Sequence, residues 1–164
     1  MNRLTTLLLC SALVMTTASC GFRLRGSYDI PADLKQVHVA SWDEYAELTR
    51  KVEDRLKVND VKLLKDPSKE QSLIILKRDN LSERTLSLFS DGQVAEYQLI
   101  YSTQFELLVP GKEPQRYDIE VVRQYQDDPN RALAKEKEKR LLVSEMRAEA
   151  ADKILRTLAS SQVR

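Results

Sequence analysis

Alternating apolar and polar residues form the clearest pattern in the chain, and they predict a long β-strand. From Ala95 to Val109 every second residue is apolar or a threonine, and polar residues such as Glu96 and Gln104 stand between them. A strand that is buried on one face shows this period of two residues. At ~3.3 Å per residue the segment would extend ~50 Å, so part of it is expected to project beyond the core.

Turn residues on either side extend this strand into a three-stranded meander. Asp91-Gly92 is a strong hairpin signal, because its backbone adopts the positive φ angles that such turns need. It follows strand-like residues 72–88, whose polar middle predicts a bend or bulge. Residues 109–114 contain two prolines and a glycine and predict a second turn, and a third alternating strand follows at 117–125.

Two segments show the helical period instead. After a short strand at 35–42, Ser41 and Glu44 fit a capping box. The next helix is predicted to end near residues 59–60, and its apolar stripe comprises Tyr45, Leu48, Val52 and Leu56.

A second, long helix is predicted at residues 131–160, with Asn130 as its N-cap. Its charged run, residues 135–140, is interpreted as a solvated half-helix supported by pairs such as Glu136 and Arg140. The apolar face of the helix comprises Val143, Met146, Ala150, Ile154 and Leu158.

Together these elements predict an α+β fold in which two helices pack on one face of a roughly four-stranded, largely antiparallel sheet. The elements belong to a single domain, residues 35–164. A domain of this size can bury an adequate core without disulfides.

The N-terminus has the features of a secretory signal. Arg3 precedes an uncharged apolar segment at residues 4–15, and small residues follow up to Cys20. This apolar segment is shorter than the ~20 residues that a membrane-spanning helix needs. We therefore predict a signal peptide at residues 1–19, followed by a polar tether at 20–34.

Residues 17–20, Thr-Ala-Ser-Cys, resemble the lipobox of bacterial lipoproteins, although Thr17 stands where leucine is usual. The resemblance implies that Cys20 becomes the acylated N-terminus of the mature chain, and several acyl chains give durable membrane anchoring. Gly21 after this cysteine implies export to the outer membrane. The alternative is ordinary cleavage, which would leave a thiol exposed to oxidation in the periplasm.

Composition narrows the classes of function. The chain has 26 basic and 25 acidic residues, and loss of the signal removes one basic residue, Arg3, so the mature protein is formally neutral. A binder of nucleic-acid backbones would carry a basic excess, so nucleic acid is not expected as a partner. One histidine and two cysteines do not supply a multi-ligand zinc site, and we expect neither metal nor cofactor.

Catalytic chemistry would have to be built around the single histidine, His38, which lies in a predicted strand. The chain has no G-x-S-x-G segment, the element that presents the nucleophile in many hydrolases. A structural role for His38 is therefore favoured, and a periplasmic hydrolase built on it is the enzymatic alternative.

Three segments, taken together, resemble the LptE family of lipopolysaccharide-assembly lipoproteins. They are Cys20-Gly21-Phe22-Arg23-Leu24-Arg25, Asp91-Gly92-Gln93-Val94-Ala95-Glu96-Tyr97-Gln98, and Asp128-Pro129-Asn130 leading to Ala132-Leu133-Ala134-Lys135. Their order and spacing match over essentially the whole mature chain. The fold of that family, two helices on a four-stranded sheet, agrees with the pattern-based prediction.

The resemblance implies a non-enzymatic plug in the lumen of the outer-membrane β-barrel LptD, which assists folding of the barrel and insertion of lipopolysaccharide into the outer leaflet. It also implies lipopolysaccharide binding, for which Lys135 is the position carried over, with Arg131 beside it. Asp91 and Gly92 mark the hairpin turn, and the residue before them, basic in some members, is Ser90 here. A lipid-anchored module that binds another envelope glycan or lipid without a barrel partner is the alternative.

Overall fold

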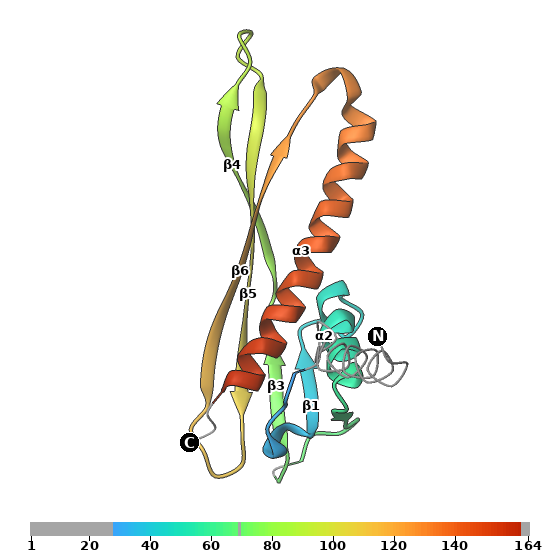
Figure 1. Ribbon diagram of the computed structural model, residues 1–164, viewed down its shortest axis with the longest axis vertical. Helices are drawn as coiled ribbons and strands as arrows, with labels where there is room; N and C mark the ends of the chain where they lie inside the picture. The colour runs from blue at the N-terminus through green and yellow to red at the C-terminus, as the bar shows by residue number, and fades with distance from the viewer. Residues whose placement is uncertain (1–27, 69, 162–164) are drawn as a thin grey trace, which may run out of the picture.

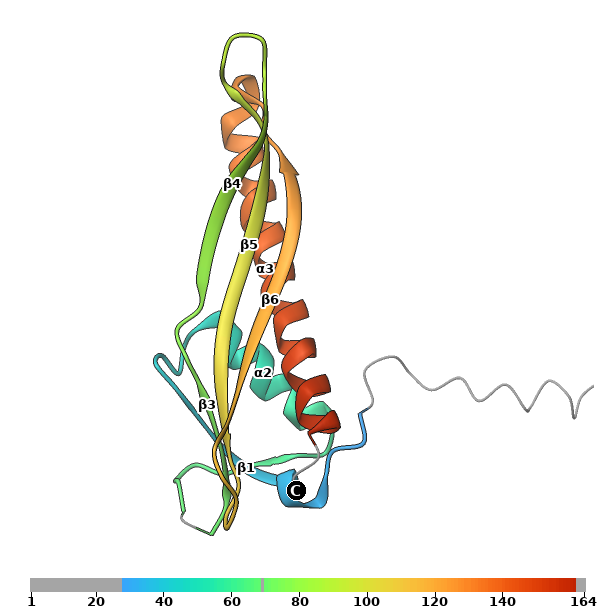
Figure 2. The same cartoon turned by 90° about the vertical axis from the view of Figure 1, so that its left-hand side faces the viewer.

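A twisted sheet with two helices on one face makes up the fold (Figure 1, Figure 2). The computed structural model describes residues 28–68 and 70–161, so the predicted signal peptide and Cys20 lie outside the described residues. The elements are η1 (Ala32–Leu34), β1 (Gln36–Ser41), α2 (Glu47–Val58), β2 (Lys62–Leu63), β3 (Ser72–Leu76), β4 (Asn80–Leu88), β5 (Val94–Leu108), β6 (Gln115–Gln126), η2 (Pro129–Arg131) and α3 (Ala132–Ser160). No helix in this part of the chain combines the length and apolarity needed to cross a membrane.

The long strand β5 organises the sheet. Along one of its edges β5 pairs first with β4 and then with β3, and its other edge pairs with β6 over almost its whole length. The chain leaves the ladder at residues 77–79 between β3 and β4, which confirms the predicted bend. The β4–β5 hairpin projects past the end of β6, as its length predicts (Figure 1).

The predicted α+β class with two helices on one face is confirmed, but the sheet has six strands rather than four and is mixed. β1 runs parallel to both β2 and β3, whereas the other pairs are antiparallel. The parallel pairing arises because α2 is a crossover that returns the chain to the same end of the sheet. β2 has two residues, too few to show a periodic pattern.

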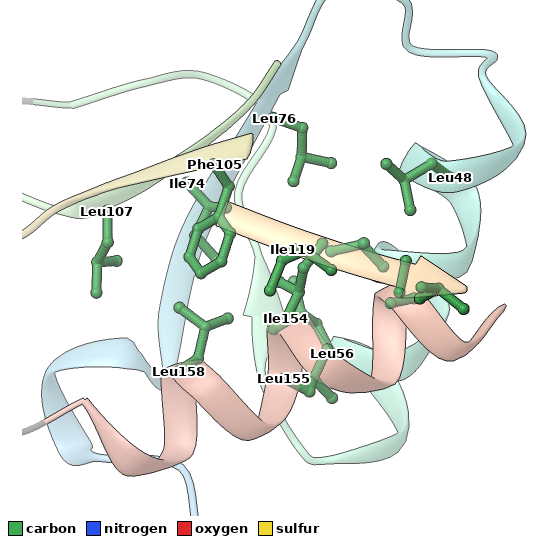
Figure 3. Packing of buried hydrophobic residues seen from close by; sticks show 14 of the residues in the cluster. Leu48, Leu56, Ile74, Leu76, Phe105, Leu107, Ile119, Ile154, Leu155 and Leu158 are labelled. Carbon is green, nitrogen blue, oxygen red and sulfur yellow. The ribbon is translucent and has the colours of Figure 1, made fainter. Parts of the chain in front are cut away.

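Residues of the apolar stripes predicted for the two helices are buried in one core (Figure 3). In α2 the buried residues include Leu48, Val52 and Leu56, and in α3 all five predicted residues are buried together with Ala151 and Leu155. These side chains meet the inner face of β5, including Phe105 and Leu107. Ile30 and Leu34 are also buried, so the last part of the predicted tether belongs to the core.

The predicted helix starts were wrong in detail. Helix α2 begins at Glu47 with no side-chain cap, because the Asp43 carboxylate accepts the Tyr45 N–H in a preceding turn instead of a Ser41–Glu44 capping box forming. Tyr45 consequently lies outside the stripe, with 82% of its surface exposed. At α3 the N-cap is Arg131, which makes no side-chain cap hydrogen bond, rather than Asn130. Asp128 caps the short helix η2 that precedes α3.

The packing of the core can be tested with the same substitution, leucine to alanine, at two positions of α3. Leu155→Ala removes a fully buried side chain and should lower the free energy of unfolding by about 2–5 kcal/mol. Leu141→Ala, at a position that is 62% exposed, should change it by less than about 0.5 kcal/mol. Urea unfolding of the two variants measures the difference, and equal losses would contradict the packing of α3 described here.

Candidate functional site

An open hollow lies where the β4–β5 turn meets the start of α3, at the upper end of the molecule in Figure 1. It brings together Ser90 and Asp91 from the turn with Arg131 and Lys135 from the helix start. The remaining lining residues are Phe89, Gln93, Gln126, Asp127, Asp128, Pro129 and Asn130. Three of the four predicted site residues of the domain therefore lie around one space, and the fourth, Gly92, shapes the turn.

The hairpin turn lies where it was predicted, but of Asp91 and Gly92 only Gly92 has a positive φ. Gly92 has a φ of 86°, and its N–H donates to the carbonyl of Phe89 at 3.0 Å. The Phe89 N–H donates to the carbonyl of Gln93 at 2.8 Å, and the Asp91 carboxylate accepts the Gln93 N–H at 3.0 Å. Asp91 thus stabilises the turn, and glycine at position 92 avoids the strain that a side chain would meet at this φ.

The start of α3 suits an anion. No side chain caps its N-terminus and no acidic residue lies in its first turn, so the exposed N–H groups carry the positive end of the helix dipole. Arg131 is exposed, and its guanidinium forms no ion pair with any residue in the described part of the chain. Three carboxylates, those of Asp91, Asp127 and Asp128, also line the hollow. Each accepts a backbone N–H and keeps its negative charge.

Lys135 is turned inward, contrary to the prediction of a solvated half-helix. Its side chain is 15% exposed, and its Nζ lies 4.9 Å from the ring centroid of Tyr125 and 2.8 Å from the Glu138 carboxylate. The predicted ion pair between Glu136 and Arg140 is present at 3.6 Å on the exposed side. The prediction was wrong for Lys135 because an aromatic surface on β6 lies beneath this face of the helix.

Lys139, one helical turn further on, lies over the same aromatic surface. Its Nζ is 5.8 Å from the ring centroid of Tyr97 and 6.0 Å from that of Tyr125, and it pairs with Glu83 of β4 at 2.5 Å. Tyr97 and Tyr125 are opposite each other in the β5–β6 ladder, with their rings stacked. Cations are favoured over such ring faces.

Tyr125 also fixes the backbone of α3. Its hydroxyl donates to the carbonyl oxygen of Lys135 at 2.8 Å. Burial, with further contributions from the nearby acids Asp127, Glu138 and Glu83, raises the pKa of Tyr125 to about 12. The phenol is therefore a protonated donor at neutral pH and holds the first turns of the helix on the sheet.

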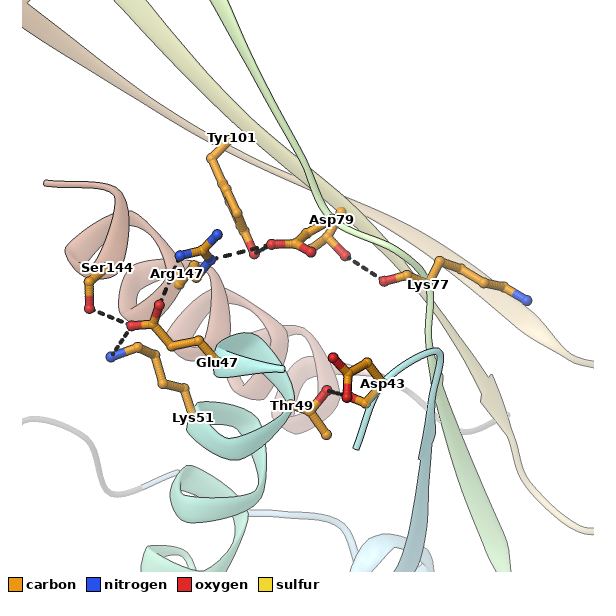
Figure 4. Close-up of polar contacts among 10 residues, drawn as sticks. Asp43, Glu47, Thr49, Lys51, Lys77, Asp79, Tyr101, Ser144 and Arg147 are labelled. Carbon is orange, nitrogen blue, oxygen red and sulfur yellow. Dashed lines mark hydrogen bonds and ion pairs between the residues drawn. The ribbon is translucent and has the colours of Figure 1, made fainter. Parts of the chain in front are cut away.

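A second polar network holds the middle of α3 (Figure 4). Arg147 donates to Glu47 of α2 at 2.8 Å and lies 3.4 Å from the carboxylate of Asp79, in the break between β3 and β4. The Tyr101 hydroxyl of β5 donates to the same Asp79 carboxylate at 2.7 Å. One guanidinium therefore joins both helices to the sheet.

The contacts of this network shift the pKa of Glu47 and of Tyr101. Burial alone would raise the pKa of Glu47, but hydrogen bonds from Ser144, Arg147 and Lys51 outweigh burial and lower it. Burial and the hydrogen bond to Asp79 raise the pKa of Tyr101, so it stays a neutral donor.

His38 has a structural contact. Its Nδ1 lies 2.9 Å from the carbonyl oxygen of Leu64 and so ties β1 to the chain that follows β2.

Comparisons with known proteins place the chain in a family. Residues 34–158 match the sequence profile of a family described as LptE, lipopolysaccharide-assembly. The chain is 39% identical over 159 residues to the LPS-assembly lipoprotein LptE of Pectobacterium atrosepticum, covering 96% of this chain and 85% of that protein. It belongs to the LptE family. The LptE protein of Photorhabdus laumondii is 37% identical over 157 residues, with 96% and 86% coverage.

The fold of this LptE-family chain is found in a solved structure as well. The crystal structure of the rare lipoprotein B from Shewanella oneidensis superposes with a TM-score of 0.73 and 48% sequence identity. The match covers 78% of this chain and 96% of that one. The family names support a lipoprotein with a role in lipopolysaccharide assembly.

Four residues near Lys135 in this LptE-family chain were not among the predicted site residues: Glu83, Tyr97, Tyr125 and Lys139. The spacing of Lys135 and Lys139 puts both on one helix face and was a usable signal. No local pattern indicates that Glu83 pairs with Lys139, because the two meet only through the packing of β4 near α3.

The Glu47 network predicts a pH-dependent stability. Glu47→Gln should lower the free energy of unfolding by on the order of 1 kcal/mol at neutral pH. Because folding lowers the pKa of Glu47 from 4.5, its contribution is present above pH 4.5 and is lost as the pH falls through the lowered value. Urea unfolding of wild type and variant across this range should show their difference shrinking towards acid.

Glu136→Gln is the control, because Glu136 is exposed and belongs to a surface pair. A constant difference between Glu47→Gln and wild type at every pH would contradict the assigned protonation behaviour.

Proposed function

We propose that this LptE-family protein is the plug and assembly partner of the outer-membrane lipopolysaccharide translocon, the β-barrel LptD, and that it binds lipopolysaccharide at the hollow beside Lys135. It supports folding of the barrel and insertion of lipopolysaccharide into the outer leaflet, and it performs no catalysis. The observation that carries the binding proposal is the placement of Arg131 and Lys135 at the uncapped start of α3, next to the hairpin turn.

The chemistry of this end fits a phosphorylated lipid. The backbone N–H groups of a helix N-terminus bind phosphate readily. Arg131 adds a planar guanidinium that suits phosphate oxygens, and Lys135 adds a compact ammonium group. The hollow of 640 Å³ is open to solvent, so a large headgroup can approach without a change of fold.

The shape and surface of the domain fit a partner that surrounds it. β5 and α3 give the molecule two elements of ~45–50 Å at the standard rise per residue. At the projecting hairpin, Leu86, Leu88 and Phe89 are exposed, and such a cluster commonly marks a contact with another protein. Charges of both signs cover much of the rest, which suits the polar lumen of a barrel.

The anchor that Cys20 would carry leads into the other end of the domain. The described chain begins at Tyr28, whose N–H donates to the Asn59 side chain at the end of α2. Arg55, in the last turn of α2, pairs with Asp152 of α3. Asp152 lies ~25 Å along the helix from Lys135 at 1.5 Å per residue, so an outer-membrane anchor leaves the cationic end free to meet lipid.

Purification of the full-length protein from its native envelope in mild detergent tests the proposal. We expect one large outer-membrane β-barrel to co-purify in stoichiometric amount, together with lipopolysaccharide. Lys135→Glu should reduce the lipopolysaccharide recovered by about tenfold, the scale of one lost charge-assisted contact, and leave the barrel in place. Lys137→Glu, the same charge change at an exposed position of the same helix, is the control.

Two results would contradict the proposal. Recovery of the lipoprotein alone, under conditions that preserve other barrel complexes, would favour a lipid-anchored module that binds an envelope glycan or lipid without a barrel. Equal loss of barrel and lipopolysaccharide in Lys135→Glu would argue against a separate lipid site.

A further inference from the structure

Lys139 shares the surroundings of Lys135. Both lysines are half-buried, while Lys137 between them is exposed. Their ammonium groups lie 4.9 Å and 6.0 Å from the centroid of the same ring, that of Tyr125. The tyrosine rings thus hold two positive charges side by side, one helical turn apart.

Each of these charges is neutralised by a carboxylate of the same chain. Glu138 pairs with Lys135 from the next turn of α3, and Glu83 reaches Lys139 from β4. Among the described residues, Glu83–Lys139 is also the one ion pair that joins β4 to α3. These carboxylates compete with a phosphate group for the N–H donors and the positive charge of the two lysines.

We propose that Lys139 is a second phosphate-binding cation beside Lys135. The Glu83 carboxylate occupies the place of the phosphate at Lys139 until a phosphorylated lipid displaces it. The inference rests on the proposed lipopolysaccharide binding and adds to it a second cation and an internal competitor. A phosphate carries up to two negative charges and three acceptor oxygens, so it satisfies an ammonium group at least as well as a single carboxylate does. Release of Glu83 also removes the ion pair between the projecting hairpin and α3.

Binding of purified diphosphoryl lipid A to the full-length protein in detergent measures this directly. Lys139→Ala and Lys135→Ala should each weaken binding by about tenfold. Lys137→Ala supplies the matched control, and Lys139→Arg should retain binding because it keeps the charge. Thermal unfolding of each variant shows that the fold is intact.

Glu83→Gln gives the sharper test, because it should strengthen binding by about threefold or more when a competing carboxylate is removed. Glu136→Gln changes the net charge equally at a solvent-exposed pair and should leave affinity nearly unchanged. In the Lys139→Ala background, Glu83→Gln should have no greater effect than Glu136→Gln. If Glu83 has only a structural role, Glu83→Gln should weaken binding, or its effect should be the same with Lys139 as with Lys139→Ala.

The outcomes separate the two proposals. If the wild type binds lipid A and Lys135→Ala weakens binding, but Lys139→Ala matches Lys137→Ala or Glu83→Gln matches Glu136→Gln, this inference is overturned and the proposed function stands. If the wild type binds no lipid A, the lipid-binding part of the proposed function fails and the inference fails with it.

Discussion

The packing of α3 along β5 and β6 is the contact on which the other features of the domain depend. The lower half of the helix carries its buried residues, Ala150 and Ala151 among them, and these residues share one core with α2. The upper half has little apolar surface to bury. It stays on the sheet through polar and cation–aromatic contacts, chiefly those of Tyr125 with the backbone of Lys135 and with the two lysine side chains.

This division gives the two ends of the molecule different physical characters. The lower end gains stability from burial of apolar surface, which does not depend on charge pairing. At the upper end, charges lie in partly solvated ion pairs that are individually weak and exchangeable. The Arg147 network stands at the boundary, where it ties α2, α3 and the break between β3 and β4 together. Binding of a charged lipid at the upper end, as proposed, would therefore leave the core intact.

The long-range patterns of the sequence predicted much of this fold. The period of β5, the Asp91-Gly92 turn and the apolar face of α3 are each set by many residues or by a backbone requirement, and all three were predicted correctly. The parallel pairing of β1, the start of α2 and the inward turn of Lys135 depend on contacts with distant segments. Asp43 competing for a backbone N–H, and a tyrosine on β6 beneath a helix, leave no local pattern.

At the candidate site, too, contacts between distant segments could not be predicted from the sequence. Asp91, Arg131 and Lys135 were proposed from resemblance, and the fold brings them around one hollow. Their spacing in the chain gives no indication of Glu83 or of the tyrosine pair, because β4, β5, β6 and α3 meet there only after folding.

The central claim is that lipopolysaccharide meets this protein at the end formed by the β4–β5 turn and the start of α3. A photo-cross-linking residue placed at Ser90, in that turn, or at Glu113, in the β5–β6 turn at the opposite end, tests it in native envelopes (Figure 1). The account predicts a lipopolysaccharide adduct from position 90 and little or none from position 113. Equal adducts from both positions, or an adduct from position 113 alone, would contradict it.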